Sequence, residues 1–152
     1  GNTMQKNWLS TCVVILIGAL AMNVAQAQEE PPFIPGDYWE VTGIDVSDGA
    51  GLKYARWLAD EWRKNLEFSK SQGWIKDYIV LNNVHPRSDE PDLYLIRIFE
   101  NMATVEEGEK RREAYMAWAK KSMDKMAAES GNRAEYRTIM STSLLRHMNF
   151  RD

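Results

Sequence analysis

The chain has 152 residues, of which 44% are apolar, 27% charged and 11% aromatic, and its net charge at pH 7 is −3. This length suits a single domain with a hydrophobic core of its own. The acidic balance argues against the basic surface of a nucleic-acid-binding protein. Six Trp, six Tyr and four Phe argue against a disordered chain. We therefore expect one globular domain that binds no nucleic acid.

The first 27 residues have the pattern of a cleavable secretory signal peptide. Lys6 precedes an apolar run at 8–22, and the segment ends at the small-x-small site Ala25-Gln26-Ala27. A transmembrane anchor is the alternative, but the run has about 15 residues, whereas a spanning helix needs about 20. The pattern predicts a periplasmic or secreted protein that has no membrane segment after cleavage.

Cleavage after Ala27 would remove Cys12, the only cysteine of the chain. The remaining 125 residues (152 − 27) would carry 18 basic and 22 acidic side chains, a net charge of −4. A domain without cysteine has neither disulfides nor Cys-based metal sites. The two histidines, His85 and His147, match no metal-binding motif. We therefore expect no metal and no cofactor.

Residues 37–152 have the pattern of one α+β domain, preceded by an extended, proline-rich lead-in at 28–36. Apolar alternation and many β-branched or aromatic side chains predict four strands, at 38–46, 74–82, 93–99 and 138–146. Helical spacing of apolar residues predicts two helices between them, at about 51–71 and 104–128.

Local signals support both helices. Gly73 is a typical helix-ending glycine, and Thr104 with Glu107 forms a capping box at the start of the second helix. Gly131 and Asn132 are a candidate interruption near its end. The apolar stripe of the first helix is Leu52, Ala55, Leu58, Ala59, Trp62 and Leu66. The aromatic residues off the stripes belong either to a pocket lip or subunit contact, or to a wider core: Tyr54, Trp57, Phe68, Tyr115 and Trp118.

The order β-α-β-β-α-β predicts a ferredoxin-like fold, in which two helices cover one face of a four-stranded antiparallel sheet. The third strand has two alternating sets: Tyr94, Ile96 and Ile98, and Leu93, Leu95, Arg97 and Phe99. We assign the second set to the uncovered face, where its apolar side chains need a partner. The expected partner is a second copy of the chain, packed sheet against sheet in a homodimeric barrel.

Several short segments then point to a family. They are Trp39-Glu40-Val41-Thr42, Trp62 with Gly73-Trp74-Ile75, Pro91-Asp92-Leu93-Tyr94-Leu95 and Asn101-Met102. In their order and spacing the chain resembles the dimeric α/β-barrel superfamily, antibiotic-biosynthesis-monooxygenase-like, and looks most like its secreted bacterial members. The resemblance covers nearly the whole mature chain. It implies a homodimer and, in an enzyme, cofactor-free oxygenation or proton transfer on an activated aromatic compound.

Arg97 is the first candidate site residue, because a buried guanidinium requires an anionic partner. Either it binds the carboxylate or phosphate of a ligand, or it forms an internal ion pair with Glu40, Asp77 or the partner chain. The other ligand-binding candidates are Trp62, Asn82 and Tyr94.

His85 and His147 are the candidate catalytic bases, because an imidazole titrates near neutral pH; a plain surface position is the alternative for each. Haem-degrading relatives use an Asn, a Trp and a His on a helix. Neither predicted helix contains a histidine, so Asn82, Trp62 and His85 could imitate that set only from different elements. We expect a protein that binds a small aromatic or acidic compound, with or without catalysis. The alternative is a non-catalytic protein-interaction or structural domain.

Overall fold

The computed structural model describes residues 29–152, so the predicted signal peptide lies outside the described residues. The compact unit Pro31–Asp152 contains a four-stranded antiparallel sheet with the strand order β2-β3-β1-β4. The α+β class predicted from the sequence is therefore confirmed. None of the helices between residues 29 and 152 combines the length and the apolarity needed to cross a lipid bilayer.

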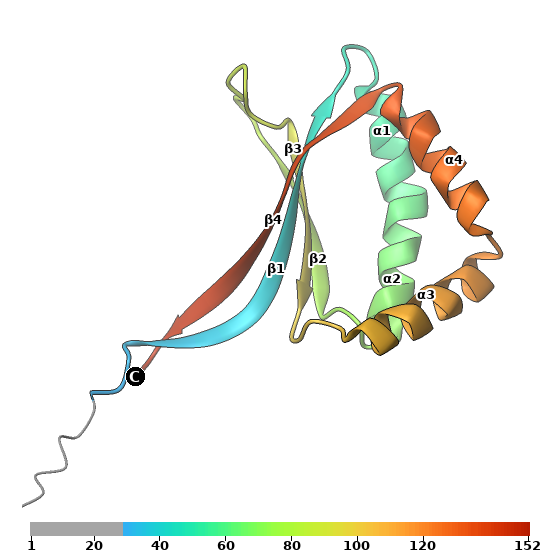
Figure 1. Ribbon diagram of the computed structural model, residues 1–152. Helices are drawn as coiled ribbons and strands as arrows, with labels where there is room; N and C mark the ends of the chain where they lie inside the picture. The colour runs from blue at the N-terminus through green and yellow to red at the C-terminus, as the bar shows by residue number, and fades with distance from the viewer. Residues whose placement is uncertain (1–28) are drawn as a thin grey trace, which may run out of the picture. The chain divides into compact units, whose positions relative to one another are not determined.

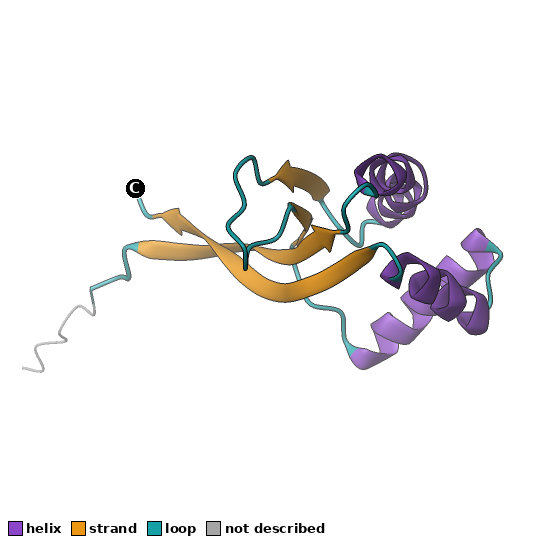
Figure 2. Ribbon diagram, turned by 90° about the horizontal axis from the view of Figure 1, so that it is seen from above, coloured by secondary structure: helices purple, strands orange, loops and turns teal. Residues whose placement is uncertain are grey.

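The helices lie on one side of the sheet (Figures 1 and 2). The strands are β1 (Phe33–Val46), β2 (Asp77–Asn82), β3 (Leu93–Phe99) and β4 (Arg137–Phe150). The helical segments are α1 (Gly51–Trp57), the π-helical η1 (Leu58–Trp62), α2 (Arg63–Ser71), α3 (Val105–Ala119) and α4 (Met123–Ala134).

The strands β1 and β4 are longer than predicted, because they pair with each other far beyond the rest of the sheet (Figure 1). β1 begins at Phe33, which pairs with Phe150 with the two rings 5.0 Å apart. The strand therefore takes in residues 33–36, which the sequence analysis assigns to the lead-in. A bulge between Pro35 and Tyr38 accommodates a proline that cannot donate to the ladder.

The first helix occupies its predicted range, 51–71, but a π turn interrupts it at its centre. Its inward residues are Tyr54, Leu58, Trp62 and Leu66. In a regular α-helix each step of four residues drifts by about 40° around the axis. The wider π turn offsets part of this drift and keeps the four side chains in line. The predicted stripe is wrong at three positions, which are exposed: Leu52, Ala55 and Ala59.

The core lies between the sheet and the first half of this helix. Ile44, Leu95, Tyr54 and Leu58 form one buried cluster. The pairing of β3 with β1 puts Leu95 and Arg97 on the same side of the sheet as Ile44, towards the helices. The assignment of this set to the uncovered face is therefore wrong. An alternation of period two shows which residues share a face, but not which face the helices cover.

The second predicted helix is in fact two helices that meet at residues 120–122. α3 begins with the predicted capping box, in which Glu107 N donates to Thr104 Oγ1 at 3.2 Å. It ends at Lys120, whose φ of 55° is left-handed, and Ser122 then caps α4. α4 continues through Gly131, so the predicted interruption there is wrong and the break lies at Lys120.

Candidate functional site

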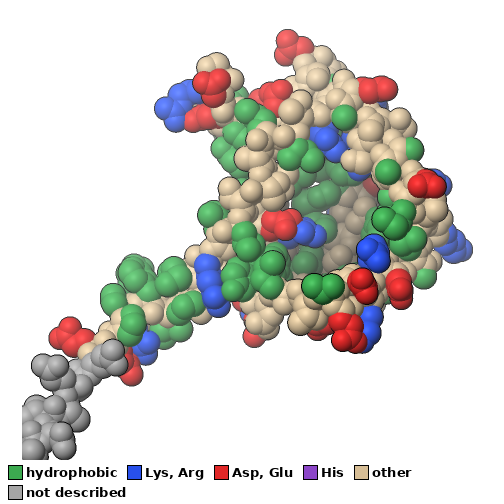
Figure 3. Space-filling view, viewed as in Figure 1, with side chains coloured by type: hydrophobic (Ala, Val, Ile, Leu, Met, Phe, Trp, Pro, Cys, Tyr) green, Lys and Arg blue, Asp and Glu red, His purple; other side chains and the backbone are tan. Residues whose placement is uncertain are grey.

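A cavity of about 650 Å³ lies between the sheet and the helices. This volume is within the range of about 300–1,000 Å³ that is usual for small-molecule sites. The walls come from the helix-facing side of β1 and β3, from the long helix α1–η1–α2, from α3 and from the start of β4. Figure 3 shows the hollow between the sheet and the helices.

One wall of the cavity is aromatic. Tyr54 and Trp57 stack with their ring centroids 5.5 Å apart and an interplanar angle of 10°. One turn further along the helix, Trp62 meets the ring of Tyr78 edge-on at 5.5 Å. The Tyr78 hydroxyl donates to a carboxylate oxygen of Glu67, which ties β2 to α2. Flat, fixed rings of this kind offer a large contact area to a planar ligand.

The cavity is rich in positive charge although the chain as a whole is acidic. Four arginines line it against a single carboxylate, that of Glu40, among the described residues. The arginines are Arg97, Arg111, Arg112 and Arg137. Such a surface favours the approach of anions and disfavours cations.

The internal ion pair considered for Arg97 is present. Its Nη2 and Nε atoms lie 2.6 Å and 2.9 Å from Oε1 of Glu40, which is its cross-strand neighbour. The pair neutralises Arg97 within the protein, although the guanidinium still lines the cavity. A role of Arg97 in contacting a ligand stays a prediction.

Arg137 differs from Arg97 in its surroundings. It is only 9% exposed, and the ion pairs formed within residues 29–152 leave it without a carboxylate partner. Its neighbour is Tyr54, which is 1% exposed. Burial raises the pKa of the Tyr54 hydroxyl, and the guanidinium beside it opposes that rise.

Two more donors near Tyr54 have no hydrogen-bond partner among the described protein atoms. They are Trp57 Nε1 and Arg133 Nε, both buried. The Arg133 guanidinium lies 4.3 Å from the centre of the Trp57 ring. An unpaired buried N–H costs about 1–3 kcal/mol. Of these two residues Trp57 lines the cavity and Arg133 does not, so Trp57 is the one that a ligand in the cavity would contact.

A second cluster joins the long helix to α3 and α4. Phe68 stacks on Trp118 with 4.4 Å between the ring centroids. Lys121 Nζ lies 2.6 Å from a carboxylate oxygen of Glu129 and 3.4 Å from one of Glu61. These contacts hold α3 and α4 beside the cavity. The aromatic residues outside the predicted stripes therefore have two roles: Tyr54 belongs to the core, and Trp118 packs α3 against the long helix.

Of the predicted ligand-binding residues, the structure brings two to the cavity. Arg97 and Trp62 line it. Asn82 is exposed at the end of β2. Tyr94 pairs with Gly43 on β1, and both residues lie on the face of the sheet that points away from the helices. Asn82 and Tyr94 therefore lie apart from the cavity.

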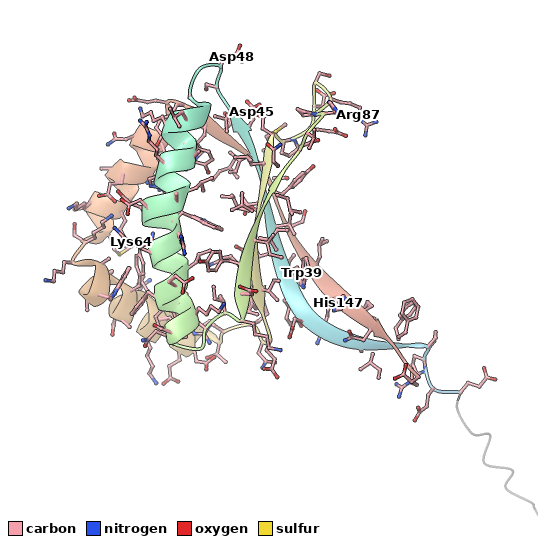
Figure 4. The ribbon with its side chains drawn as sticks, turned by 180° about the vertical axis from the view of Figure 1, so that it is seen from behind. Trp39, Asp45, Asp48, Lys64, Arg87 and His147 are labelled. Atoms are coloured by element: carbon pink, nitrogen blue, oxygen red, sulfur yellow. The ribbon has the colours of Figure 1, made fainter. Side chains whose placement is uncertain are left out.

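Neither predicted catalytic histidine reaches the cavity. His85 is exposed in the loop between β2 and β3. His147 is exposed on β4, with its ring 6.3 Å from that of Trp39. Figure 4 shows Trp39 and His147 on the long strands, on the side of the sheet away from the helices. The structure thus brings no imidazole to the aromatic wall.

Sequence reasoning missed Arg137 as a site residue and named Tyr54 only among the aromatic residues that belong either to a pocket lip or subunit contact, or to a wider core. Arg137 precedes the predicted strand by one residue, and Tyr54 falls outside the predicted stripe. One signal was available: Arg137 is two residues before Ile139, so the two side chains lie on the same face of the strand, and both line the cavity. Arg137 and Tyr54 come together only because β4 pairs with β1 at Val46 and because the first helix turns Tyr54 towards the sheet.

No group of three or more His, Cys, Asp or Glu side chains in the described part of the chain is arranged to hold a metal ion. Comparisons with protein-family models, with curated proteins and with solved structures found no match to this chain. The resemblance to dimeric α/β-barrel proteins therefore stays a prediction, and the functional argument depends on the cavity itself.

Proposed function

We propose that this protein binds a small organic compound with a planar, apolar body in the cavity between its sheet and its helices. The observation that carries the proposal is a 650 Å³ cavity in which an aromatic wall faces several polar groups. Apolar walls with a few converging polar groups are typical of small-molecule sites. The two histidines offered as catalytic bases lie outside the residues that line the cavity, so the proposal is one of binding.

Tryptophan fluorescence tests this function, since Trp57, Trp62 and Trp74 all line the cavity. Titration with 2-naphthoate and with 2-naphthamide should give saturable quenching with one site per chain. Trp62→Leu should weaken the binding several-fold. Trp39→Leu is the matched control because Trp39 lies on the other side of the sheet, and it should leave the affinity unchanged.

Two outcomes contradict the proposal. One is the absence of saturable binding by either naphthalene compound. The other is a loss of affinity in Trp39→Leu equal to that in Trp62→Leu, because binding would then occur outside the cavity.

We also propose a ferredoxin-like fold whose uncovered sheet face packs against a second copy of the chain in a barrel. The support is an alternation of apolar residues on that face, with Leu145 53% and Leu81 49% exposed. β4 is moreover a 14-residue edge strand, and long edges are usually covered. Sedimentation should give a dimer for the native chain and a monomer for Leu145→Glu; a monomeric native chain overturns this arrangement.

Export stays part of the proposal. The signal peptide at 1–27 would deliver the domain to the periplasm or the exterior. N-terminal sequencing of the protein from its own host should begin at Gln28, and recovery of the intact N-terminus contradicts cleavage.

A further inference from the structure

We propose that the ligand of this cavity carries a carboxylate, which binds to Arg137 and Tyr54 where α1 meets the start of β4. This inference rests on the proposed binding function and names the class of compound that the site selects, an aromatic carboxylic acid.

The first step is the uncompensated charge of Arg137. A guanidinium that is 9% exposed has lost most of its hydration, and such a group needs an anion nearby. The described residues supply Tyr54 but no carboxylate. An anion brought by a ligand would supply the missing charge.

The second step concerns the hydrogen bonds that remain available. An arginine can only donate, whereas a tyrosine hydroxyl both accepts and donates. When the Tyr54 oxygen accepts from Arg137, its own proton is free to be donated to an oxyanion. Trp57 Nε1, buried and unpaired within the described atoms, is a further donor at the same end.

The third step is the charge presented by each element around this point. α4 contributes Arg133, α1 contributes Lys53 over the ring of Tyr136 at 4.1 Å, and β4 contributes Arg137 itself. Ile44, on the adjacent strand β1, is apolar. Glu129, one turn before Arg133 on α4, already accepts from Lys121. Among the described residues that line the cavity itself, four arginines face a single carboxylate, so positive charge predominates there.

The fourth step selects a carboxylate over a phosphate. Arg133, although its guanidinium lies 4.3 Å from the centre of the Trp57 ring, is not among the described residues that line the cavity. Arg137 is then the one guanidinium at this end that lines the cavity without a carboxylate nearby. The guanidinium fork binds carboxylates and phosphates alike, but a carboxylate carries the single negative charge that balances one arginine, whereas a phosphate monoester carries about 1.5–2 negative charges at pH 7. The stacked Tyr54 and Trp57, with Trp62 beyond, would receive the aromatic body.

Calorimetric titration of the full chain at pH 7 with 2-naphthoate, 2-naphthamide and 2-naphthyl phosphate tests the inference. We expect 2-naphthoate to bind at least about tenfold more tightly than the amide, as a charge-assisted hydrogen bond predicts. The phosphate should bind more weakly than the carboxylate. The amide comparison uses the unmodified protein, so it does not depend on the folding of any variant.

Arg137→Gln should weaken the binding of 2-naphthoate at least about tenfold. It should change the affinity for 2-naphthamide by no more than about twofold. Arg137→Lys keeps the charge without the fork and should give an intermediate loss. Arg146→Gln is the matched control, because Arg146 lies on the same strand, is exposed and bonds to Gly36 O and Tyr38 Oη. It should leave both affinities unchanged.

The outcomes separate this inference from the function on which it rests. Equal binding of the acid and the amide, or an Arg137→Gln variant with unchanged preference, overturns the carboxylate and leaves the binding function standing. Tighter binding of the phosphate overturns it in favour of a phosphate ester. Failure of all three compounds to bind overturns the binding function and this inference together.

Discussion

Arg97 and Glu40 lie directly opposite each other on β3 and β1, with Arg97 Nη2 2.6 Å from Glu40 Oε1 on the cavity side of the sheet. The pair places a positive and a negative group at the cavity wall, where each reduces the field of the other. Glu40 therefore limits how strongly the cavity attracts an anion.

Replacing Glu40 with Gln should free Arg97 and strengthen the binding of 2-naphthoate about threefold or more. The effect on folding should be below about 1 kcal/mol, because the Arg97 side chain is 42% exposed and exposed pairs contribute little. Calorimetry measures the affinity. Glu106→Gln, in an exposed pair with Lys110 on α3, is the control. Unchanged or weaker binding by the Glu40 variant contradicts the prediction.

The packing of β3 against α1 gives a stability prediction. Leu95 is 7% exposed within the cluster that contains Tyr54 and Leu58. Leu95→Ala should lower the free energy of unfolding by about 2–4 kcal/mol, through lost burial and the space left behind. Val80 pairs with Leu95 across the sheet but is 43% exposed, so Val80→Ala should change it by less than about 1 kcal/mol. Urea denaturation compares the two, and similar losses would show that Leu95 is not core.

The end of α3 contains a backbone conformation that favours glycine. Lys120 has a φ of 55°, and its N–H donates to Met116 O at the end of the helix. Lys120→Gly should raise the free energy of unfolding by about 0.5–1 kcal/mol. Glu113→Gly, in the exposed interior of α3, should lower it by a similar amount. Thermal denaturation distinguishes the two, and a destabilised Lys120→Gly variant contradicts the left-handed assignment.

The contact between Lys121 and Glu129 makes stability depend on pH. The hydrogen bond from Lys121 lowers the pKa of the Glu129 carboxyl below its ordinary 4.5. The stability from this pair is therefore complete above pH 4.5 and is lost as the pH falls through the lowered value. Glu129→Gln should reduce the melting temperature by about 3 °C at pH 7 and by nothing measurable near pH 2. Glu109→Gln, on α3, serves as control, and an effect of Glu129→Gln that persists in acid contradicts the assignment.

Local sequence patterns predicted most of the strands and helices, but not which face of each is buried. The strand at 93–99 and the capping box at Thr104 were predictable because they depend on neighbouring residues only. The side of the sheet on which Arg97 lies was not, since it depends on which face the helices cover. The π turn was not predictable from helical spacing, because apolar spacing indicates a helix of uniform period 3.6 and contains no signal for a wider turn.

The candidate site shows the same division. Helical spacing singled out Trp62, and alternation made Arg97 a candidate while leaving its partner open among Glu40, Asp77 and a second chain. Arg137 and Tyr54 lie 83 positions apart in the sequence (137 − 54), and their meeting depends on how β4 returns beside β1. No local pattern contains that information.

The π turn at residues 58–62 has a consequence for how this chain can vary. A π turn holds about one residue more than the α turn it replaces. Deleting one of these five residues would therefore restore an uninterrupted α-helix and leave the following residues, Leu66 among them, close to their present direction. The same deletion in the regular part of the helix would rotate everything after it by about 100° about the helix axis, so changes in length in homologous chains should be confined to the π turn.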